Sequence, residues 1–320
     1  MRDFDAAAKE RQAYFRATSP TIRGEGRSRN QPHHVLASGY EEENLFPTIR
    51  GQNGAREFFN IRRIKWDNPL NMASSQIACV NFLLPLASIE GALATVVRAI
   101  DDDVESIIPI SYKGTVSPVE FEWIGLEYSL ERKTTRGANT TSVDAFMIAS
   151  TNVGRRAYLI EWKYKEQYLS TKPNWRGDGY RHAKQLKGYA DLYSSSFNES
   201  IPMNELLYDP FDQIMRNRFL ADRIVAKGEL GVSDAKVVVV VPEGNRAYRT
   251  VAYGRKTTSP PLHERFPDLK TVDEVMRATL KNPDAAFKMV TPTELREAVE
   301  SECGDAVSDW AEYIRERYGW

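Results

Sequence analysis

Two charged residues interrupt an apolar run at residues 158–166, which read YLIEWKYKE. In a β-strand the side chains at positions i and i+2 share a face, so Glu161 and Lys163 project together while Ile160 and Trp162 project from the opposite face. A charged pair in such a strand has to be solvated, paired or used in chemistry. The pattern therefore indicates either a partly buried ion pair or a catalytic site.

A third charged residue, Asp144, lies in the apolar segment at residues 142–150, which alternation predicts to be the preceding strand. If the two strands pair, Asp144 lies near Glu161. Two carboxylates beside an ammonium group suit Mg²⁺, which prefers one or two carboxylates together with waters and phosphate oxygens. The backbone carbonyl of Trp162 is a further candidate ligand, and Lys163 could orient a metal-bound water and stabilise charge on a phosphate.

The acid–x–lysine pattern alone has low specificity, because it also occurs at residues 131–133. Glu131 stands at the end of a strand and turn residues follow it directly. Glu161 instead follows an apolar run and has Asp144 on the preceding strand. Context favours Glu161 as the functional acid, with a structural ion pair as the alternative.

The elements that must position these residues follow a simple order. In chain order, we predict helices at 72–87 and 89–100, strands at 119–131, 142–150 and 156–164, helices at 180–197 and 209–228, and a strand at 235–242. The first three strands form an antiparallel meander, and the last strand is apolar throughout, which fits the middle of a sheet. We therefore expect an α/β fold with a mixed central sheet.

Two helices carry start signals. Asp209 fits the N-cap of the helix at 209–228, with Pro210 at its first position. In the C-terminal segment Thr291 and Glu294 fit the N-cap and N3 positions of a capping box.

Composition excludes several classes of protein. The 320 residues are 42% hydrophobic and 27% charged, as in ordinary soluble proteins, and two cysteines are too few for a disulfide framework or a zinc cluster. No apolar run approaches the roughly 18–20 residues of a membrane span, and the N-terminus lacks a secretory signal. We expect a cytoplasmic protein with a core at 61–245, an irregular or helical N-terminal extension at 1–60 and a helical C-terminal extension at 246–320.

The net charge of −1 conceals a local excess of basic residues between positions 155 and 187, beside the candidate site. Lys165, Arg176, Arg181 and Lys184 lie in or next to the loop KPNWRGDGYR and are candidate phosphate contacts. A solvated charged surface is the alternative.

The blocks VEFEW, RGANTTSVDAFMIAS and LIEWKYKEQY resemble the PD-(D/E)xK nuclease superfamily, and within it a bacterial group of restriction-type nucleases. The resemblance extends over roughly residues 45–245. It implies a restriction-endonuclease-like αβββαβ core with helical additions, in which Asp144 and Glu161 bind Mg²⁺ and Lys163 is the catalytic lysine. The implied reaction is hydrolysis of phosphodiester bonds in DNA, in defence, restriction or repair, with Mn²⁺ able to substitute.

The chain departs from the family pattern at two positions. Residue 143 is Val instead of Pro, and the first core helix carries Gln76 where many members carry Glu. We consider Gln76, Glu122, Gln185 and Gln213 as auxiliary residues, with packing or solvation as the alternative for each.

Two other functions stay open at this stage. The protein could bind nucleic acid without cutting it, or it could be an interaction protein whose Asp, Glu and Lys form a structural network. Mg²⁺ stabilises the folded protein only if it binds to it, so stabilisation by Mg²⁺ would indicate a true metal site. Cutting both strands of a duplex with one site per subunit would favour a homodimer.

Overall fold

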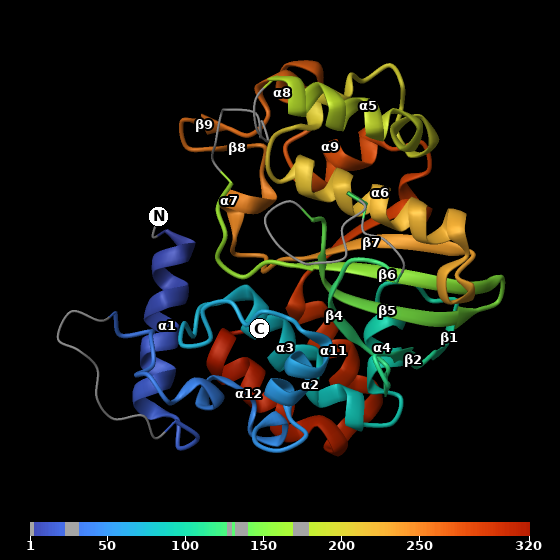
Figure 1. Ribbon diagram of the computed structural model, residues 1–320. Helices are drawn as coiled ribbons and strands as arrows, with labels where there is room; N and C mark the ends of the chain where they lie inside the picture. Colours follow the sequence, from blue (N-terminus) through green and yellow to red (C-terminus); the bar gives the residue numbers. More distant parts are fainter. Residues whose placement is uncertain (1–2, 23–31, 127–129, 132–139, 169–178) are drawn as a thin grey trace.

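The computed structural model describes residues 3–22, 32–126, 130–131, 140–168 and 179–320, with the backbone alone at 179–187. A central sheet lies between two layers of helices (Figure 1). The mixed α/β architecture predicted from the sequence is confirmed. None of the described helices is long and apolar enough to cross a membrane.

The central sheet has six strands in the order β1–β5–β6–β7–β10, and β4 shares with β1 the edge of β5 that faces away from β6. Its strands are β1 (Val104–Ile107), β4 (Glu120–Trp123), β5 (Val143–Thr151), β6 (Gly154–Trp162), β7 (Asp234–Val240) and β10 (Phe287–Val290). The pairs of β5 with β1, β4 and β6 are antiparallel, whereas β6, β7 and β10 are parallel.

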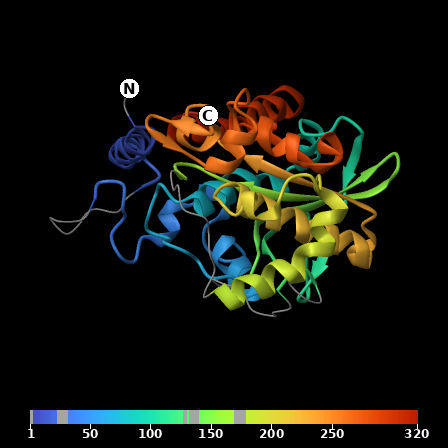
Figure 2. The same ribbon diagram turned by 90° about the horizontal axis from the view of Figure 1, so that it is seen from above.

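Helices cover both faces of the sheet. One layer contains α1 (Phe4–Thr18), α2 (Ala55–Arg62), α3 (Ser75–Leu83), α4 (Ala92–Arg98), α11 (Pro292–Cys303) and α12 (Ser308–Tyr318). The other contains α5 (Gly179–Ser196), α6 (Phe211–Lys227), α7 (Arg246–Arg249), α8 (Pro260–Arg265) and α9 (Val272–Thr279). Figures 1 and 2 both show α1, in dark blue, at one edge of the molecule.

Short elements complete the chain. They are α10 (Pro283–Ala286), the two-stranded ladders β2 (Ile110–Tyr112) with β3 (Thr115–Ser117) and β8 (Ala252–Tyr253) with β9 (Lys256–Thr257), and the 3₁₀ turns η1 (Glu41–Asn44), η2 (Pro47–Ile49), η3 (Pro85–Ser88), η4 (Met203–Leu206), η5 (Glu229–Gly231) and η6 (Gly304–Val307).

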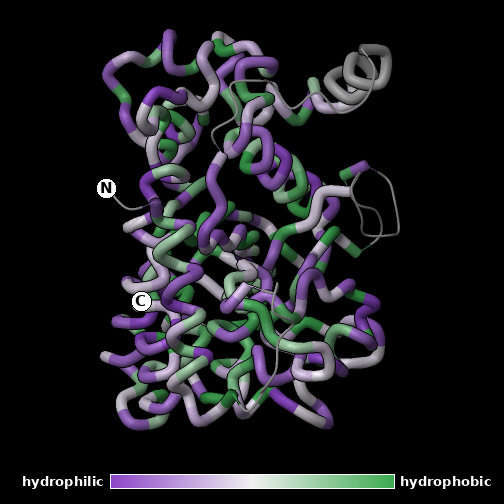
Figure 3. Tube along the Cα trace, turned by 90° about the vertical axis from the view of Figure 1, so that its left-hand side faces the viewer, coloured by the Kyte–Doolittle hydropathy of each residue, from purple (hydrophilic) through white to green (hydrophobic). Residues whose placement is uncertain are grey.

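Alternate side chains of β6 pack into two different hydrophobic cores, one on each face of the sheet. Ile160 and Trp162 pack in the core shared with α3 and α12, whereas Ala157 and Leu159 pack in the core shared with α6. Glu161 follows the alternation and belongs to the α6 face, as the sequence pattern predicts. Apolar and polar residues interleave along both helical layers (Figure 3).

The predicted order of helix, three strands, helix and strand matches α3, β4 to β6, α5 with α6, and β7. The capping box at Thr291 and Glu294 is confirmed. The N-cap prediction for Asp209 is wrong, because Pro210 occupies that position and no side chain caps α6. Strand β10 was not predicted; it lies within the C-terminal segment expected to be helical and joins the main sheet beside β7.

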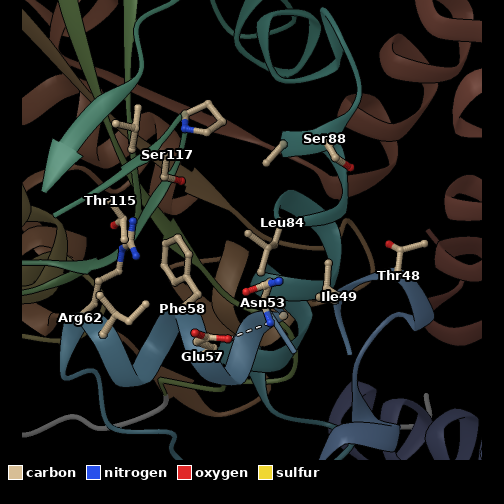
Figure 4. A pocket seen from close by; sticks show the side chains of 15 residues that line it. Thr48, Ile49, Asn53, Glu57, Phe58, Arg62, Leu84, Ser88, Thr115 and Ser117 are labelled. Carbon is tan, nitrogen blue, oxygen red and sulfur yellow. Dashed lines mark hydrogen bonds between the residues drawn. The ribbon is translucent and has the colours of Figure 1, made fainter. Parts of the chain in front are cut away.

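A buried ion pair joins α2 to β4. Arg62 Nε and Nη2 donate to the two carboxylate oxygens of Glu120 at 2.5 and 2.7 Å. The guanidinium carbon lies 3.5 Å from the centroid of the Phe58 ring, beside a cavity of about 400 Å³ (Figure 4). Glu120 is therefore engaged in packing β4 against the helical layer.

Candidate active site

The two predicted metal-binding acids lie on neighbouring strands. Pairing of Ala145 with Ile160 in the β5–β6 ladder, continued by one residue, places Asp144 opposite Glu161. Residues directly opposite in an antiparallel pair project from the same face. The structure thus brings together the two acids that the sequence pattern singled out.

The backbone of Trp162 connects the strands at this point. Its N–H donates to Asp144 Oδ2 at 2.6 Å. Because the N–H and C=O of one strand residue point toward the same neighbouring strand, the Trp162 carbonyl also points toward the β5 side. Its indole packs in the opposite core, so only the main chain of Trp162 belongs to the site.

Glu161 is almost fully buried, with 1% of its surface exposed, and its carboxylate accepts two side-chain hydrogen bonds and forms one ion pair. Lys163 Nζ and Gln213 Nε2 each lie 2.6 Å from Oε1, and Asn217 Nδ2 lies 2.7 Å from Oε2. Gln213 was a predicted auxiliary residue, and Asn217 was not predicted. Their spacing of four residues on the predicted helix was the available signal, since it puts both amides on one helical face.

Lys163 is held as a charged group. Burial alone would lower its pKa, but the neighbouring Glu161 carboxylate raises the pKa well above the usual lysine value. Its backbone N–H donates to Val240 O at 2.8 Å, and its ammonium group lies 5.7 Å from the centroid of the Tyr168 ring. A lysine that stays protonated can stabilise negative charge but cannot act as a base at neutral pH.

Asp144 favours its uncharged form, in contrast to Lys163. Burial raises the pKa of its carboxyl group well above the usual aspartate value, and the nearby Glu161 and Glu122 raise it further, while Lys163 opposes them. A second negative charge beside Glu161 is thus disfavoured, and Asp144 favours its protonated form. A divalent cation would relieve this repulsion and lower the pKa of Asp144.

Glu122 on β4 lies next to Asp144. The pairs Phe121–Ala145 and Trp123–Val143 place Glu122 opposite Asp144 in the ladder. Its φ of 49° is a left-handed value that is rare for a glutamate.

The side chain of Glu122 is fixed from two directions. Gln76 Nε2 donates to Oε1 at 2.9 Å, and Ser142 Oγ donates to Oε2 at 3.1 Å. The first core helix therefore supplies an amide, Gln76, and β4 supplies the acid that the amide orients.

A cavity of about 290 Å³ opens beside these residues and is lined by Gln76, Glu122 and Asp144, among others. The predicted phosphate contact Lys165 also lines it and pairs with Asp5 of α1 at 3.3 Å. The remaining predicted contacts and auxiliary residue cannot be placed in this way: Arg176 and the side chains of Arg181, Lys184 and Gln185 lie outside the described residues.

The competing acid at residue 131 has a structural role. Glu131 accepts hydrogen bonds from the Thr141 N–H at 2.8 Å, the Thr141 hydroxyl at 2.6 Å and the Tyr189 hydroxyl at 3.1 Å. These bonds anchor the residues that lead into β5. Glu131 therefore has its own hydrogen-bond partners within the protein, and the choice of Glu161 as the functional acid stays a prediction.

The donor set suits a hard cation. In the described part of the chain, no three or more His, Cys, Asp or Glu side chains form a group that could hold a metal ion. Two carboxylates, Asp144 and Glu161, and the Trp162 carbonyl offer oxygen ligands only. Such a partial set fits Mg²⁺, which keeps several waters, better than it fits Zn²⁺ or Ca²⁺.

Comparison with known proteins identifies one family. A family model described as "Restriction Endonuclease associating with ARP" matches residues 8–319, so it includes α12 and most of α1 as well as the central sheet. No curated protein and no solved structure matches the chain.

Proposed function

The chain belongs to the family of restriction endonucleases associating with ARP, and on that premise we propose that it is a Mg²⁺-dependent nuclease of the PD-(D/E)xK type. Its substrate in this proposal is DNA, and its reaction is hydrolysis of phosphodiester bonds. The observation that carries the proposal is the meeting of Asp144, Glu161 and Lys163 at one point of the sheet.

Asp144, Glu161 and the Trp162 carbonyl would hold the cation. Bound Mg²⁺ would supply an activated water and neutralise charge on the phosphate. Binding requires Asp144 to lose its proton, and the raised pKa of that carboxyl makes metal affinity increase with pH. Mn²⁺, which accepts the same oxygen ligands, is expected to replace Mg²⁺.

Lys163 would act on the phosphate rather than as a base. Its ammonium group, fixed by Glu161 at 2.6 Å, is placed to stabilise the negative charge that develops during hydrolysis. Removing one such preorganised donor typically lowers kcat by about 10²–10³-fold. Glu122, oriented by Gln76, is the auxiliary acid in this proposal, and Lys165 is a phosphate contact at the cavity.

A structural ion network is the second candidate, because Glu161 already receives two hydrogen bonds and one ion pair from protein groups. Asp144 argues against it. A purely structural network would not keep a half-buried carboxyl group whose ionisation is opposed by Glu161 and Glu122. A cation that binds there would stabilise the ionised form of Asp144 and give this carboxyl group a role.

Cleavage assays test the proposal directly. Supercoiled plasmid, labelled single-stranded DNA and labelled RNA would each be incubated with the protein in Mg²⁺, Mn²⁺ or EDTA. We expect metal-dependent cutting of DNA and none in EDTA. Cutting of RNA alone would overturn the substrate assignment. Cutting that persists in EDTA would overturn the metal mechanism.

If no substrate is cut, the melting temperature with and without Mg²⁺ separates the two remaining functions. Stabilisation by Mg²⁺ in the absence of cutting would favour a nucleic-acid-binding protein that retains the site. No effect of Mg²⁺ would favour the structural network.

A further inference from the structure

Asn217 contacts a different oxygen of Glu161, the candidate metal ligand, from the oxygen that Lys163 and Gln213 contact. A carboxylate has about four lone-pair positions for donors. On Glu161, the ion pair with Lys163 and the hydrogen bond from Gln213 are both at Oε1, whereas Asn217 is the hydrogen-bond donor to Oε2 among the described residues. Among the described residues, Oε2 therefore has fewer contacts than Oε1, and Oε2 is the oxygen that Asn217 orients.

The rest of the Asn217 side chain is unusual for a buried amide. The residue has no exposed surface, and its Oδ1 has no hydrogen-bond partner among the described residues. A buried acceptor without a donor destabilises the folded state, and an apolar residue of the same size would not carry this cost. The amide at position 217 is therefore explained by its hydrogen bond to Glu161 and not by the packing of α6.

We propose that Asn217 is a positioning residue that turns Glu161 Oε2 toward Mg²⁺. The inference rests on the proposed function, because it gives Glu161 the role of metal ligand. The N–H group of Asn217 holds the carboxylate in one orientation. Its unpartnered Oδ1, beside the same carboxylate, is explained if a hydrated cation brings hydrogen-bond donors to this place. Groups that orient a metal ligand typically change metal affinity by about 10–100-fold when they are removed.

The test measures metal binding without any substrate. The melting temperature of protein freed of metal with EDTA would be followed against Mg²⁺ and Mn²⁺ concentration, which gives an apparent Kd by linkage. The variants are Asn217→Leu, Gln213→Leu and Asn81→Leu. Gln213→Leu also removes an amide donor from Glu161, but from Oε1. Asn81 is a buried asparagine of α3 that bonds to Phe46, Asn44 and Tyr318, so it serves as the matched control for lost stability.

We expect Asn217→Leu to weaken metal binding by about 10–100-fold, and Gln213→Leu to weaken it less. Asn81→Leu should lower the melting temperature and leave the apparent Kd at the wild-type value. If Asn217→Leu does not fold, Asn217→Ala, which introduces no extra bulk, replaces it in the same comparison.

Two results would overturn the inference. One is an Asn217 variant that binds metal as tightly as the wild type. The other is an equal loss of metal affinity in the Asn217 and Gln213 variants, which would mean that both amides only stabilise the Glu161 carboxylate by hydrogen bonds. Both results can be interpreted only if the wild-type protein binds metal. A wild type whose melting temperature does not respond to Mg²⁺ or Mn²⁺ would instead overturn the proposed function, and this inference with it.

Discussion

In the proposed site, Asp144 is the residue whose protonation would couple stability to metal binding. Its pKa is raised by burial, Glu161 and Glu122, so the folded protein holds this proton more tightly than the unfolded chain does. A raised carboxyl pKa favours folding at low pH. That contribution is lost as the pH rises from the ordinary aspartate pKa of about 3.9 through the raised value of the folded state.

Asp144→Asn should abolish this pH-dependent loss of stability, because asparagine does not titrate. In EDTA, we expect Asp144→Asn to melt at a higher temperature than the wild type at neutral pH, by about 2 °C or more, with a smaller difference near pH 4. Mg²⁺ should raise the melting temperature of the wild type and leave the variant unchanged. Scanning calorimetry between pH 4 and 8 provides the measurement.

Asp309→Asn, an exposed change on α12, is the control for loss of one negative charge. If the difference between Asp144→Asn and wild type does not change with pH, Asp144 is not the coupled group.

The central residues of the site were readable from the sequence for a physical reason. Strand alternation places Glu161 beside Lys163, and a short hairpin places Asp144 opposite Glu161, so local rules suffice. Asn217 lies 56 residues from Glu161 and meets it only through packing of α6 on the sheet. The sequence also offered Glu122 and Gln76 separately, but their hydrogen bond depends on how α3 packs against β4.

At the scale of elements, the Arg62–Glu120 pair connects α2 to the strand that carries Glu122. The side chains are 2% and 1% exposed, so neither charge is hydrated. Removing one partner takes away the buried ion pair of the other charge, which typically costs about 3–5 kcal/mol. Replacing both partners by apolar residues is often neutral or stabilising.

We therefore expect Arg62→Met to lower the free energy of unfolding by about 3–5 kcal/mol, and Arg62→Met with Glu120→Leu to recover most of the loss. Urea denaturation of the single and double variants measures both. A single variant that loses less than about 1 kcal/mol would show that this pair is not a buried, mutually dependent contact.

Elements were predicted well where their patterns are long and less well where they are short. β5 and β6 have nine residues each, and their alternation is clear. β10 has four residues, FKMV, and becomes a strand only because β7 offers a parallel partner. β4 ends at Trp123, much earlier than the predicted limit of 131.

At the scale of the whole molecule, distant parts of the chain support the end of β6. Gln12 on α1 donates to the Tyr164 hydroxyl at 3.0 Å and to the Arg317 carbonyl at 2.9 Å. Arg317 in turn lies in α12, which packs against α1. Both terminal helices thus brace the segment that directly follows Lys163, which agrees with a family match over residues 8–319.

If each chain carries the one site proposed here, duplex cleavage should depend on protein concentration. If the protein cuts both strands as a homodimer, the rate of forming linear plasmid should rise with about the second power of protein concentration, and the rate of nicking with about the first. Gel analysis of plasmid products over a range of protein concentrations measures both rates. Accumulation of nicked circles without linear product at every concentration would indicate a monomeric nickase.

The most direct test of the central claim is plasmid cleavage in Mg²⁺ by Lys163→Ala, with Lys236→Ala as its matched control. Lys236 is also a buried lysine paired with an acid, Asp101, but it lies on β7 away from the site. We predict that Lys163→Ala lowers the cleavage rate by about 10²-fold or more, while Lys236→Ala still cleaves despite its lower stability. Cleavage by Lys163→Ala at the wild-type rate would contradict the assignment of the active site.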